Sequence, residues 1–524
     1  MRSVMKHSFS EVPRANIPRS SFNRSHGLKS TFDADYLIPV LVDDIVPGDT
    51  FNVNMNFFAR LATPLYPIMD NLYLESFFFF VPYRLVWDSW EKMHGAQDDP
   101  ADSIDFTVPQ IANFAVTTGS IYDYAGLPII GTGMNCSALP FRAYNLIWNE
   151  WFRDQNLQNS VTVSTADSND SGGTYTLLKR GKRHDYFTSC LPWPQKGDAV
   201  SLPLGTTAPV TGIGFQSGTM PTTNTSVTET GGGADTYTEA WISANIASYL
   251  AFEGDGSDNP NIYADLSTAT AATINDLRLA FQTQRLLERD ARSGTRYNEL
   301  ILSHFGVTVP DFRVQRPEFL GGGSSTINIT PVAQTSGQPT PAANDKLGEL
   351  AGFGTTAGSH GFTKSFVEHG ILIGLVNVRS DITYSQGLER YWSKTTRYDF
   401  FYPVLAQIGE QAVLNKEIYY NNDANDDLVF GYQERYAEYR YKPSRLTGLM
   451  KPGVSGTLEA WNLSEEFSSL PTLGSTFIES NTGTPLDRAI QINTEPHTIF
   501  DSFFNMQCAR PMPLHGVPGN LDHF

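Results

Sequence analysis

Four consecutive phenylalanines in the segment 75–87, "ESFFFFVPYRLVW", constrain the fold more than any other stretch of this chain. A strand with one face in water alternates apolar and polar residues, because successive side chains point to opposite faces. This run does not alternate, and burying four phenylalanines is worth roughly 6–12 kcal/mol. We therefore expect a strand covered on both faces. The cover is either the chain's own elements or another copy of the protein, so core and subunit interface are both candidate roles for Phe77, Phe78, Phe79 and Phe80.

Other segments rich in β-branched and aromatic residues are bounded by Pro and Gly, which is the pattern of strands. They are spread over most of the chain, without the regularly interleaved helices of a βαβ fold. The sequence therefore favours a mainly β, antiparallel sandwich with long connections. Two strands are expected in 36–61, and one each in 72–87, 365–384, 427–443 and 497–513, whereas the Gly- and Ser-rich stretch 321–361 is expected to be a loop.

Two segments have the periodicity of amphipathic helices. In 139–156 the apolar residues recur at helical spacing, and 273–297 begins with Thr273 as an N-cap and has Gly294 near its end. The stripe of the first helix consists of Tyr144, Ile147, Trp148, Trp151 and Phe152. We expect both helices to pack on the sandwich.

Charge divides the chain into three parts. The formal net charge is −18, yet residues 1–30 carry six Lys or Arg side chains against Glu11 alone. Residues 197–277 contain no Lys or Arg but nine carboxylates, and they are dominated by Thr, Ser, Gly and Ala. We expect a basic arm (1–30), a body (31–196 and 278–524) and a surface insertion (197–277).

Nothing in the sequence indicates an enzyme, a cofactor or a metal site. The GxSxG, HExxH and Walker motifs are absent. Glu150 and Asp154 have the spacing of a glycosidase pair, but a solvated helix face is favoured. For the acidic stretch 421–427, a turn is favoured over a cation site.

Cys136, Cys190 and Cys508 lack the spacing of a disulfide framework or zinc cluster, which favours a reducing compartment. No apolar run predicts a secretory signal or a membrane span.

Two basic groups are candidates for contact with nucleic acid. One is the arm, whose alternative is a disordered tail; the other is "KRGKRHDYF" (179–187), whose alternative is a salt-bridged loop. The candidate residues are Arg2, Lys6, Arg14, Arg19, Arg24, Lys29, Lys179, Arg180, Lys182 and Arg183. The segment 432–443 mixes tyrosines with alternating charges, which favours an interface or paired strand made by Tyr432, Tyr436, Tyr439 and Tyr441.

Long blocks of the chain together resemble the major capsid proteins of gokushoviruses, small single-stranded DNA phages of the microvirus family. The blocks are "SFNRSHGLKSTFDADYLIPVLVDDIVPGDTF" (21–51), 59–92, "YNLIWNEWFRDQN" (144–156), 180–197, 274–299 and "FGYQERYAEYRYKPSR" (430–445). The resemblance covers nearly the whole chain except the insertion and the stretch near 325–360.

This resemblance implies an eight-stranded antiparallel jelly roll, assembled as copies into a T=1 icosahedral shell around circular single-stranded DNA. It also implies that the insertion builds threefold protrusions that attach to a host surface receptor. A small basic DNA-binding protein and a pilot protein are the implied partners. The protein would be made in the host bacterial cytoplasm and reside in the virion.

The jelly roll alone leaves another class open, because carbohydrate-binding proteins and glycoside hydrolases share it. A general DNA-coating protein is disfavoured by the net charge of −18. We further expect that removing residues 1–30 leaves the sandwich folded but weakens retention of DNA in particles. Trimming 205–265 is expected to spare folding of the monomer while abolishing or changing host adsorption.

Overall fold

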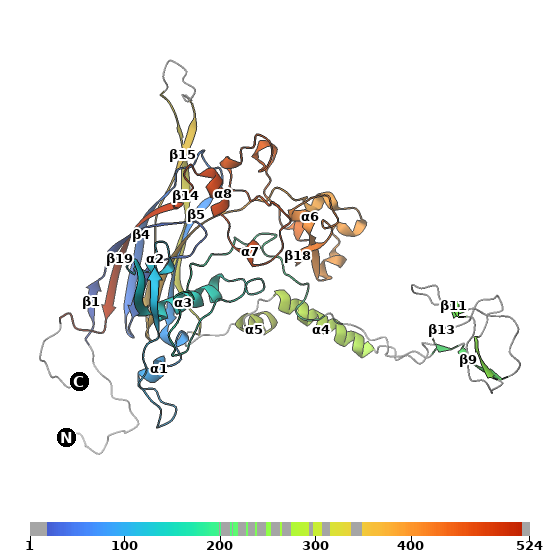
Figure 1. Cartoon of the computed structure of the whole chain (residues 1–524), viewed down its shortest axis with the longest axis horizontal. Coiled ribbons are helices and arrows are strands. Elements are labelled where there is room, and N and C mark those ends of the chain that lie inside the picture. Colours follow the sequence, from blue (N-terminus) through green and yellow to red (C-terminus); the bar gives the residue numbers. More distant parts are fainter. Residues whose placement is uncertain are drawn as a thin grey trace. The chain divides into compact units, whose positions relative to one another are not determined.

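The computed structural model describes residues 18–198, 200, 274–292, 297–305, 315–336 and 348–515; for short strands within 210–264 and for 297–300 it describes the backbone alone. The chain forms two compact units, Met1–Pro194 with Thr295–Phe524, and Gln195–Gly294. The larger unit holds the sheet that dominates Figure 1.

Nine strands of the larger unit pair in one antiparallel sheet, in the order β1-β19-β4-β15-β14-β5-β16-β3, with β2 also pairing with β19. β1 and β2 lie on successive parts of β19, so together they occupy one edge position, and the sheet has eight positions. The strands are β1 (Ser20–Asn23), β2 (His26–Phe32), β3 (Ile38–Ile45), β4 (Thr50–Leu61), β5 (Leu72–Pro82), β14 (Glu318–Ala333), β15 (Leu350–Ser365), β16 (Gly370–Ser380) and β19 (Thr498–Arg510).

The sheet folds into two halves, β2-β19-β4-β15 and β3-β16-β5-β14, which are joined where β14 pairs with β15. This is the arrangement of an antiparallel jelly roll, as the resemblance implied. In β4 and β19, buried and exposed residues alternate along nearly the whole strand, because only one face of each strand packs on the core. The core between the halves includes Phe51, Met55, Phe78, Phe80, Leu372, Phe500 and Phe504.

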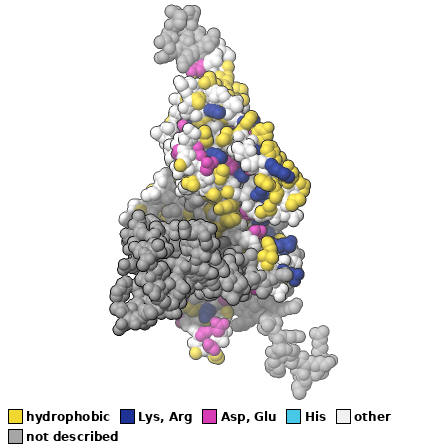
Figure 2. Space-filling model, turned by 90° about the vertical axis from the view of Figure 1, so that its right-hand side faces the viewer, with side chains coloured by type: hydrophobic (Ala, Val, Ile, Leu, Met, Phe, Trp, Pro, Cys, Tyr) yellow, Lys and Arg dark blue, Asp and Glu magenta, His cyan; other side chains and the backbone are white. Residues whose placement is uncertain are grey.

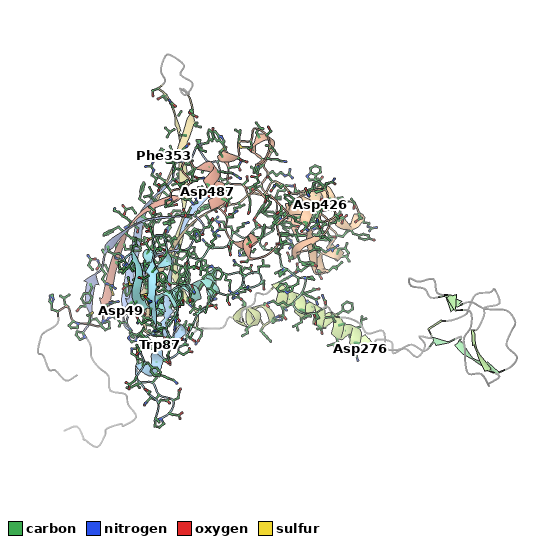
Figure 3. The ribbon with its side chains drawn as sticks, in the orientation of Figure 1. Asp49, Trp87, Asp276, Phe353, Asp426 and Asp487 are labelled. Atoms are coloured by element: carbon green, nitrogen blue, oxygen red, sulfur yellow. The ribbon has the colours of Figure 1, made fainter. Side chains whose placement is uncertain are left out.

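A second apolar layer covers the outer face of β5 and β16. It is built from the helix α3 (Leu139–Ile147), a π-helical turn (Trp148–Phe152) and the paired strands β6 (Gln110–Val116) and β7 (Ile130–Ser137). Every residue of β16 is buried, since both of its faces are packed. Trp87, labelled in Figure 3, is fully buried in this layer and donates its indole N–H to Asp167 Oδ1 at 2.6 Å.

The prediction of a loop at 321–361 is wrong. β14 and β15 occupy most of this stretch and join the two halves of the jelly roll (Figure 1). A Cβ on Gly322 would lie 2.1 Å from the carbonyl oxygen of Ser76, and one on Gly323 would lie 2.4 Å from the ring of His360. These glycines therefore mark close approach of neighbouring strands, a second meaning of glycine besides flexibility.

The strand predicted at 427–443 is confirmed only in part. β18 (Val429–Glu434) pairs with β17 (Glu410–Leu414) in a separate two-stranded sheet, and α6 (Asn415–Ile418) follows β17 directly. The strand ends before Tyr436, which adopts a left-handed conformation with φ of 62°. The rest of the segment is a turn and a short 3-10 helix, because that conformation cannot continue an extended strand.

The predicted helices are largely confirmed. The first continues from α3 through the π-helical turn to Phe152, and the second is α4 (Ile274–Arg292). A separate helix, α5 (Tyr297–Phe305), follows, whereas Thr273 and Gly294 lie outside the described residues. The remaining helices are short: α1 (Trp90–Met93), α2 (Ile121–Tyr124), α7 (Ser475–Ile478) and α8 (Gly483–Ala489). Within the described residues, no helix is long and apolar enough to span a bilayer.

The smaller unit contains three nested antiparallel pairs and α4. β8 (Val210–Thr211) pairs with β13 (Tyr263–Ala264), β9 (Ile213–Ser217) with β12 (Ser248–Phe252), and β10 (Val227–Thr228) with β11 (Thr236–Tyr237). The unit spans 195–294, so it includes the helix that the sequence assigned mostly to the body.

Candidate subunit and nucleic-acid contact surfaces

The phenylalanine run lies inside the larger unit. Phe78 and Phe80 belong to the core between the two halves, and Phe79 packs in the outer layer, where its ring centroid is 5.6 Å from that of Trp151. Phe77 is partly buried and meets Phe152 edge-on. Elements of the same chain therefore cover Phe78, Phe79 and Phe80, which are core residues, whereas Phe77 is half-buried.

The basic segment 179–183 is tied into the chain by ion pairs. Glu75 on β5 is paired with Arg180, with Arg183 at 3.1 Å and with Arg379 at 2.8 Å. Burial by itself raises the pKa of Glu75, but the three guanidinium groups outweigh it and hold the pKa below its ordinary value. This geometry is that of the salt-bridged loop, the alternative to a nucleic-acid site.

The two lysines of the same segment are also engaged. The buried ammonium of Lys182 is 2.7 Å from Glu465 Oε2 and lies over the ring of Phe477. Lys179 lies over the ring of Tyr36. Burial, followed by the neighbouring Arg379, lowers the pKa of Arg180 to about 10. The structure therefore presents no free cluster of cations at 179–183.

The predicted arm is divided by the structure. Arg2, Lys6 and Arg14 lie outside the described residues, whereas residues 20–32 hold β1 and β2 and pair with β19. Arg19 donates to Thr50 Oγ1 at 3.0 Å, Arg24 to Asp43 Oδ1 at 2.9 Å, and Lys29 to Asp501 Oδ2 at 3.1 Å. The boundary expected at residue 30 is therefore corrected, because the last third of the arm is an edge of the sheet.

The four candidate tyrosines differ in exposure. Tyr432 exchanges backbone hydrogen bonds with Leu191, and Tyr436 is buried with its hydroxyl donating to the carbonyl of Tyr398 at 3.2 Å. Tyr439 and Tyr441 are exposed. Tyr439 and Tyr441 are therefore the most accessible of the four, Tyr432 is half-buried, and Tyr436 is buried.

The structure reveals an apolar surface that the sequence analysis did not single out. The exposed large side chains of 398–408, which we call the apolar loop surface, are Tyr398, Phe400, Phe401, Tyr402, Val404 and Ile408. This segment carries no Lys or Arg and one acid, Asp399. Exposed apolar patches of this kind mark interaction sites. The signal was available as "YDFFYPVLAQI", a cluster of large apolar residues without strand alternation.

Hydrophobic side chains gather with Lys and Arg on one face of the molecule (Figure 2). On the larger unit, β18 and α6 lie on the side that is turned toward the viewer there (Figure 1). Tyr420, Leu428 and Val429, next to these two elements, are exposed as well. Exposed apolar side chains therefore also occur outside the apolar loop surface, next to β18 and α6.

The other candidate acids have structural roles. Asp154 accepts backbone N–H bonds from Asn156 and Leu157, so it caps a turn. Asp426, labelled in Figure 3, accepts the N–H groups of Asn421 and Asp423 within its turn. In the part of the chain that the structure describes, no group of three or more His, Cys, Asp or Glu side chains is arranged to hold a metal ion.

Comparison with known proteins gives a consistent match along the whole chain. A family described as capsid protein (F protein) of phages matches residues 10–520. A protein called capsid protein VP1 of Bdellovibrio phage phiMH2K is 46% identical over 99% of this chain and 98% of that protein. Proteins of the same name are 40% identical in Chlamydia phage 1 (99% and 98% covered) and 34% identical in Spiroplasma virus 4 (98% and 97% covered).

Proposed function

Because the chain belongs to the phage capsid protein (F protein) family, we propose that its copies close into a T=1 icosahedral shell around circular single-stranded DNA. The chain is a structural protein of the virion and not an enzyme. The observation that carries this conclusion is the full-length match to proteins called capsid protein VP1 in three phages. The carbohydrate-binding alternative shares only the jelly roll and is not favoured.

We propose that neighbouring copies cover the apolar loop surface in the shell. A closed shell requires each subunit to use different patches toward different neighbours. Phe78, Phe79 and Phe80 are already covered by their own chain, so other exposed groups are needed for contacts between copies. The apolar loop surface is such a group, and its single carboxylate adds little repulsion between copies.

The test replaces one exposed valine by a charged residue. Val404 is 87% exposed, so Val404→Asp should leave the subunit folded but place a charge in the contact between copies. We expect a large loss of fast-sedimenting shells, with the loss confirmed by electron microscopy. Val367, which is 88% exposed but lies outside the apolar loop surface, provides the matched control Val367→Asp. Shells from Val404→Asp at the normal yield, or an equal loss with the control, would contradict this assignment.

The finer proposals follow the uneven charge of the chain. Residues 197–277, with nine carboxylates and no Lys or Arg, are suited to the outside of a shell, away from DNA. We propose that this insertion builds threefold protrusions that attach to a host surface receptor.

The basic residues Arg2, Lys6 and Arg14 are proposed to contact the genome. A small basic DNA-binding protein and a pilot protein are the proposed further partners, and synthesis is proposed to take place in the host cytoplasm.

A further inference from the structure

A pocket of about 320 Å³ in the larger unit is lined by aromatic side chains. Tyr186 and Tyr441 stack in its wall, with ring centroids 5.7 Å apart and planes inclined by 6°. Trp392, which is 66% exposed, supplies a further aromatic ring. The other aromatic lining residues are Phe187 and Tyr384. The volume is within the usual range of small-molecule sites, and the walls present flat apolar faces.

The segments beside this pocket are strongly basic. Residues 390–397 and 435–451 together carry eight Lys or Arg side chains against a single acid, Glu438, in a chain whose net charge is −18. Aromatic residues are interleaved with these cations, as in "RYWSK" and "RYAEYRYK". The segment 398–408 itself contains no Lys or Arg, but Lys394 and Arg397 lie over its rings of Phe400 and Tyr402.

Three carboxylates line the pocket, and each is paired with a cation; Glu438 Oε1 lies 3.5 Å from the ammonium of Lys394. Glu389 is paired with Lys442 and Arg445, and Glu417 Oε1 lies 2.9 Å from Arg390. The other oxygen of Glu417 accepts the hydroxyl of Tyr186 at 3.0 Å. Lys451 lines the pocket and has no ion-pair partner within the described residues. The site therefore offers aromatic faces together with a cation free to meet an anion.

We propose that this pocket binds one nucleotide of a single-stranded nucleic acid. The base stacks on the exposed ring of Trp392, and Lys451 contacts a phosphate. Proteins that bind single strands combine a positive groove with aromatic rings in this way. A neutral sugar could stack on the aromatic rings but would make no ion pair with Lys451. Duplex DNA is a poorer fit, because its bases are stacked inside the helix and cannot reach the ring of Trp392. The inference rests on the proposed enclosure of single-stranded DNA and extends it by naming the residues that hold a base.

The first test compares two neighbouring aromatic residues with similar exposure. Trp392 lines the pocket and is 66% exposed, whereas Tyr391 is 61% exposed and does not line it. Binding of purified full-length subunits to a fluorescein-labelled oligodeoxythymidine is measured by fluorescence anisotropy. Trp392→Ala should weaken binding by roughly 5- to 150-fold, the range that loss of one base stack produces, while Tyr391→Ala should bind like the natural chain. Equal affinities of the two variants would overturn the proposal.

The second test concerns the phosphate contact. Each phosphate neutralised on a single strand contributes about −0.7 to the slope of log K against log salt concentration. Lys451→Ala should therefore make this slope about 0.7 less steep. Lys92→Ala removes a surface cation 3.4 Å from Asp98, away from the pocket, and should leave the slope unchanged. An unchanged slope for Lys451→Ala would contradict the phosphate contact.

Two further measurements separate this inference from the proposed function. Shell formation by Trp392→Ala is followed by sedimentation, and we expect normal shells together with weakened oligonucleotide binding. Absent shells with intact oligonucleotide binding would instead assign Trp392 to contact between copies and overturn the nucleotide site. A duplex that binds as tightly as the single strand, or displacement of the oligonucleotide by a neutral oligosaccharide, would also overturn it.

Discussion

At the scale of single residues, ion pairs stabilise the larger unit. Several of their cations belong to 179–183, which the sequence suggested as a surface that contacts nucleic acid. Glu75 lies on β5 and forms ion pairs with three guanidinium groups, two of them from the segment 179–183. Leaving any member of a buried network unpaired is costly, because a desolvated charge then lacks compensation. These cations therefore stabilise the fold instead of binding a ligand.

The lowered pKa of Glu75 predicts how stability depends on pH. A carboxyl whose folded-state pKa lies below its ordinary value of 4.5 stabilises the fold above that pH, and this contribution is lost as the pH falls. Glu75→Gln should destabilise the protein by roughly 3–5 kcal/mol at pH 7, and the difference should shrink below about pH 4.5. Thermal unfolding of both proteins across this range measures the effect.

Asp501→Asn provides the control for this prediction. Asp501 pairs with Lys29 on the surface, where both side chains are exposed. Such pairs are worth at most about 1 kcal/mol, so the control should change little at any pH. A pH-independent effect of Glu75→Gln would show that its packing, and not its charge, stabilises the fold.

At the scale of elements, the edge strand explains why the basic arm is not a single functional segment. β1 and β2 pair with β19, and Phe32 at the end of β2 is buried against Phe500, with ring centroids 5.8 Å apart. Removing residues 1–30, which we expected to leave the sandwich folded, takes away most of this edge. β2 also covers part of the core between the two halves of the sheet, because Leu28 and Phe32 pack there.

Two truncations distinguish the roles of the two parts of the arm. Deleting 1–32 should lower stability by at least about 3–5 kcal/mol relative to deleting 1–17, since loss of a buried phenylalanine alone costs this much. Differential scanning fluorimetry of the two proteins measures the difference. Deleting 1–17 removes Arg2, Lys6 and Arg14, so particles made from this protein should retain less DNA. Equal stability of the two truncated proteins would contradict the role of β1 and β2 in stability. Unchanged DNA content in particles that lack residues 1–17 would contradict the proposed contact with the genome.

At the scale of the whole molecule, the chain divides into a larger unit and a smaller unit that contains the proposed surface insertion 197–277. The jelly roll with its outer layer lies within one unit, and residues 195–294 form the other. Because the main apolar clusters are built from residues of the larger unit, that unit has its own core. We therefore expect the sheet to fold without residues 197–277.

Trimming the insertion tests this independence. A protein in which a short Gly/Ser linker replaces 205–265 should keep the unfolding temperature of the larger unit, because none of its core residues is removed. Virus carrying this change should lose or alter adsorption to host cells while its particles still form. Normal adsorption would contradict the proposed attachment role, and loss of the larger unit's unfolding transition would contradict its independence.

Much of this molecule was predictable from local patterns. The strands 38–45, 50–61, 72–82 and 498–510 and both long helices follow from apolar periodicity, because each pattern reports which faces of one element are buried. The resemblance to capsid proteins was recognisable from sequence blocks that match in the same order along the chain. The prediction of a loop at 321–361 was wrong because glycine can mark either a flexible loop or the close approach of neighbouring strands. Only the positions of those strands show which applies.

The sequence by itself determined the periodic elements, the uneven charge and the family. Only the tertiary structure decided which cations are free and what covers the phenylalanine run, because these outcomes depend on residues far apart in the chain. Arg379, for example, lies 304 positions from the Glu75 that it neutralises, and no local pattern connects the two. The same physical reason applies to the pocket, where Tyr186 meets Tyr441 only because the fold brings their segments together.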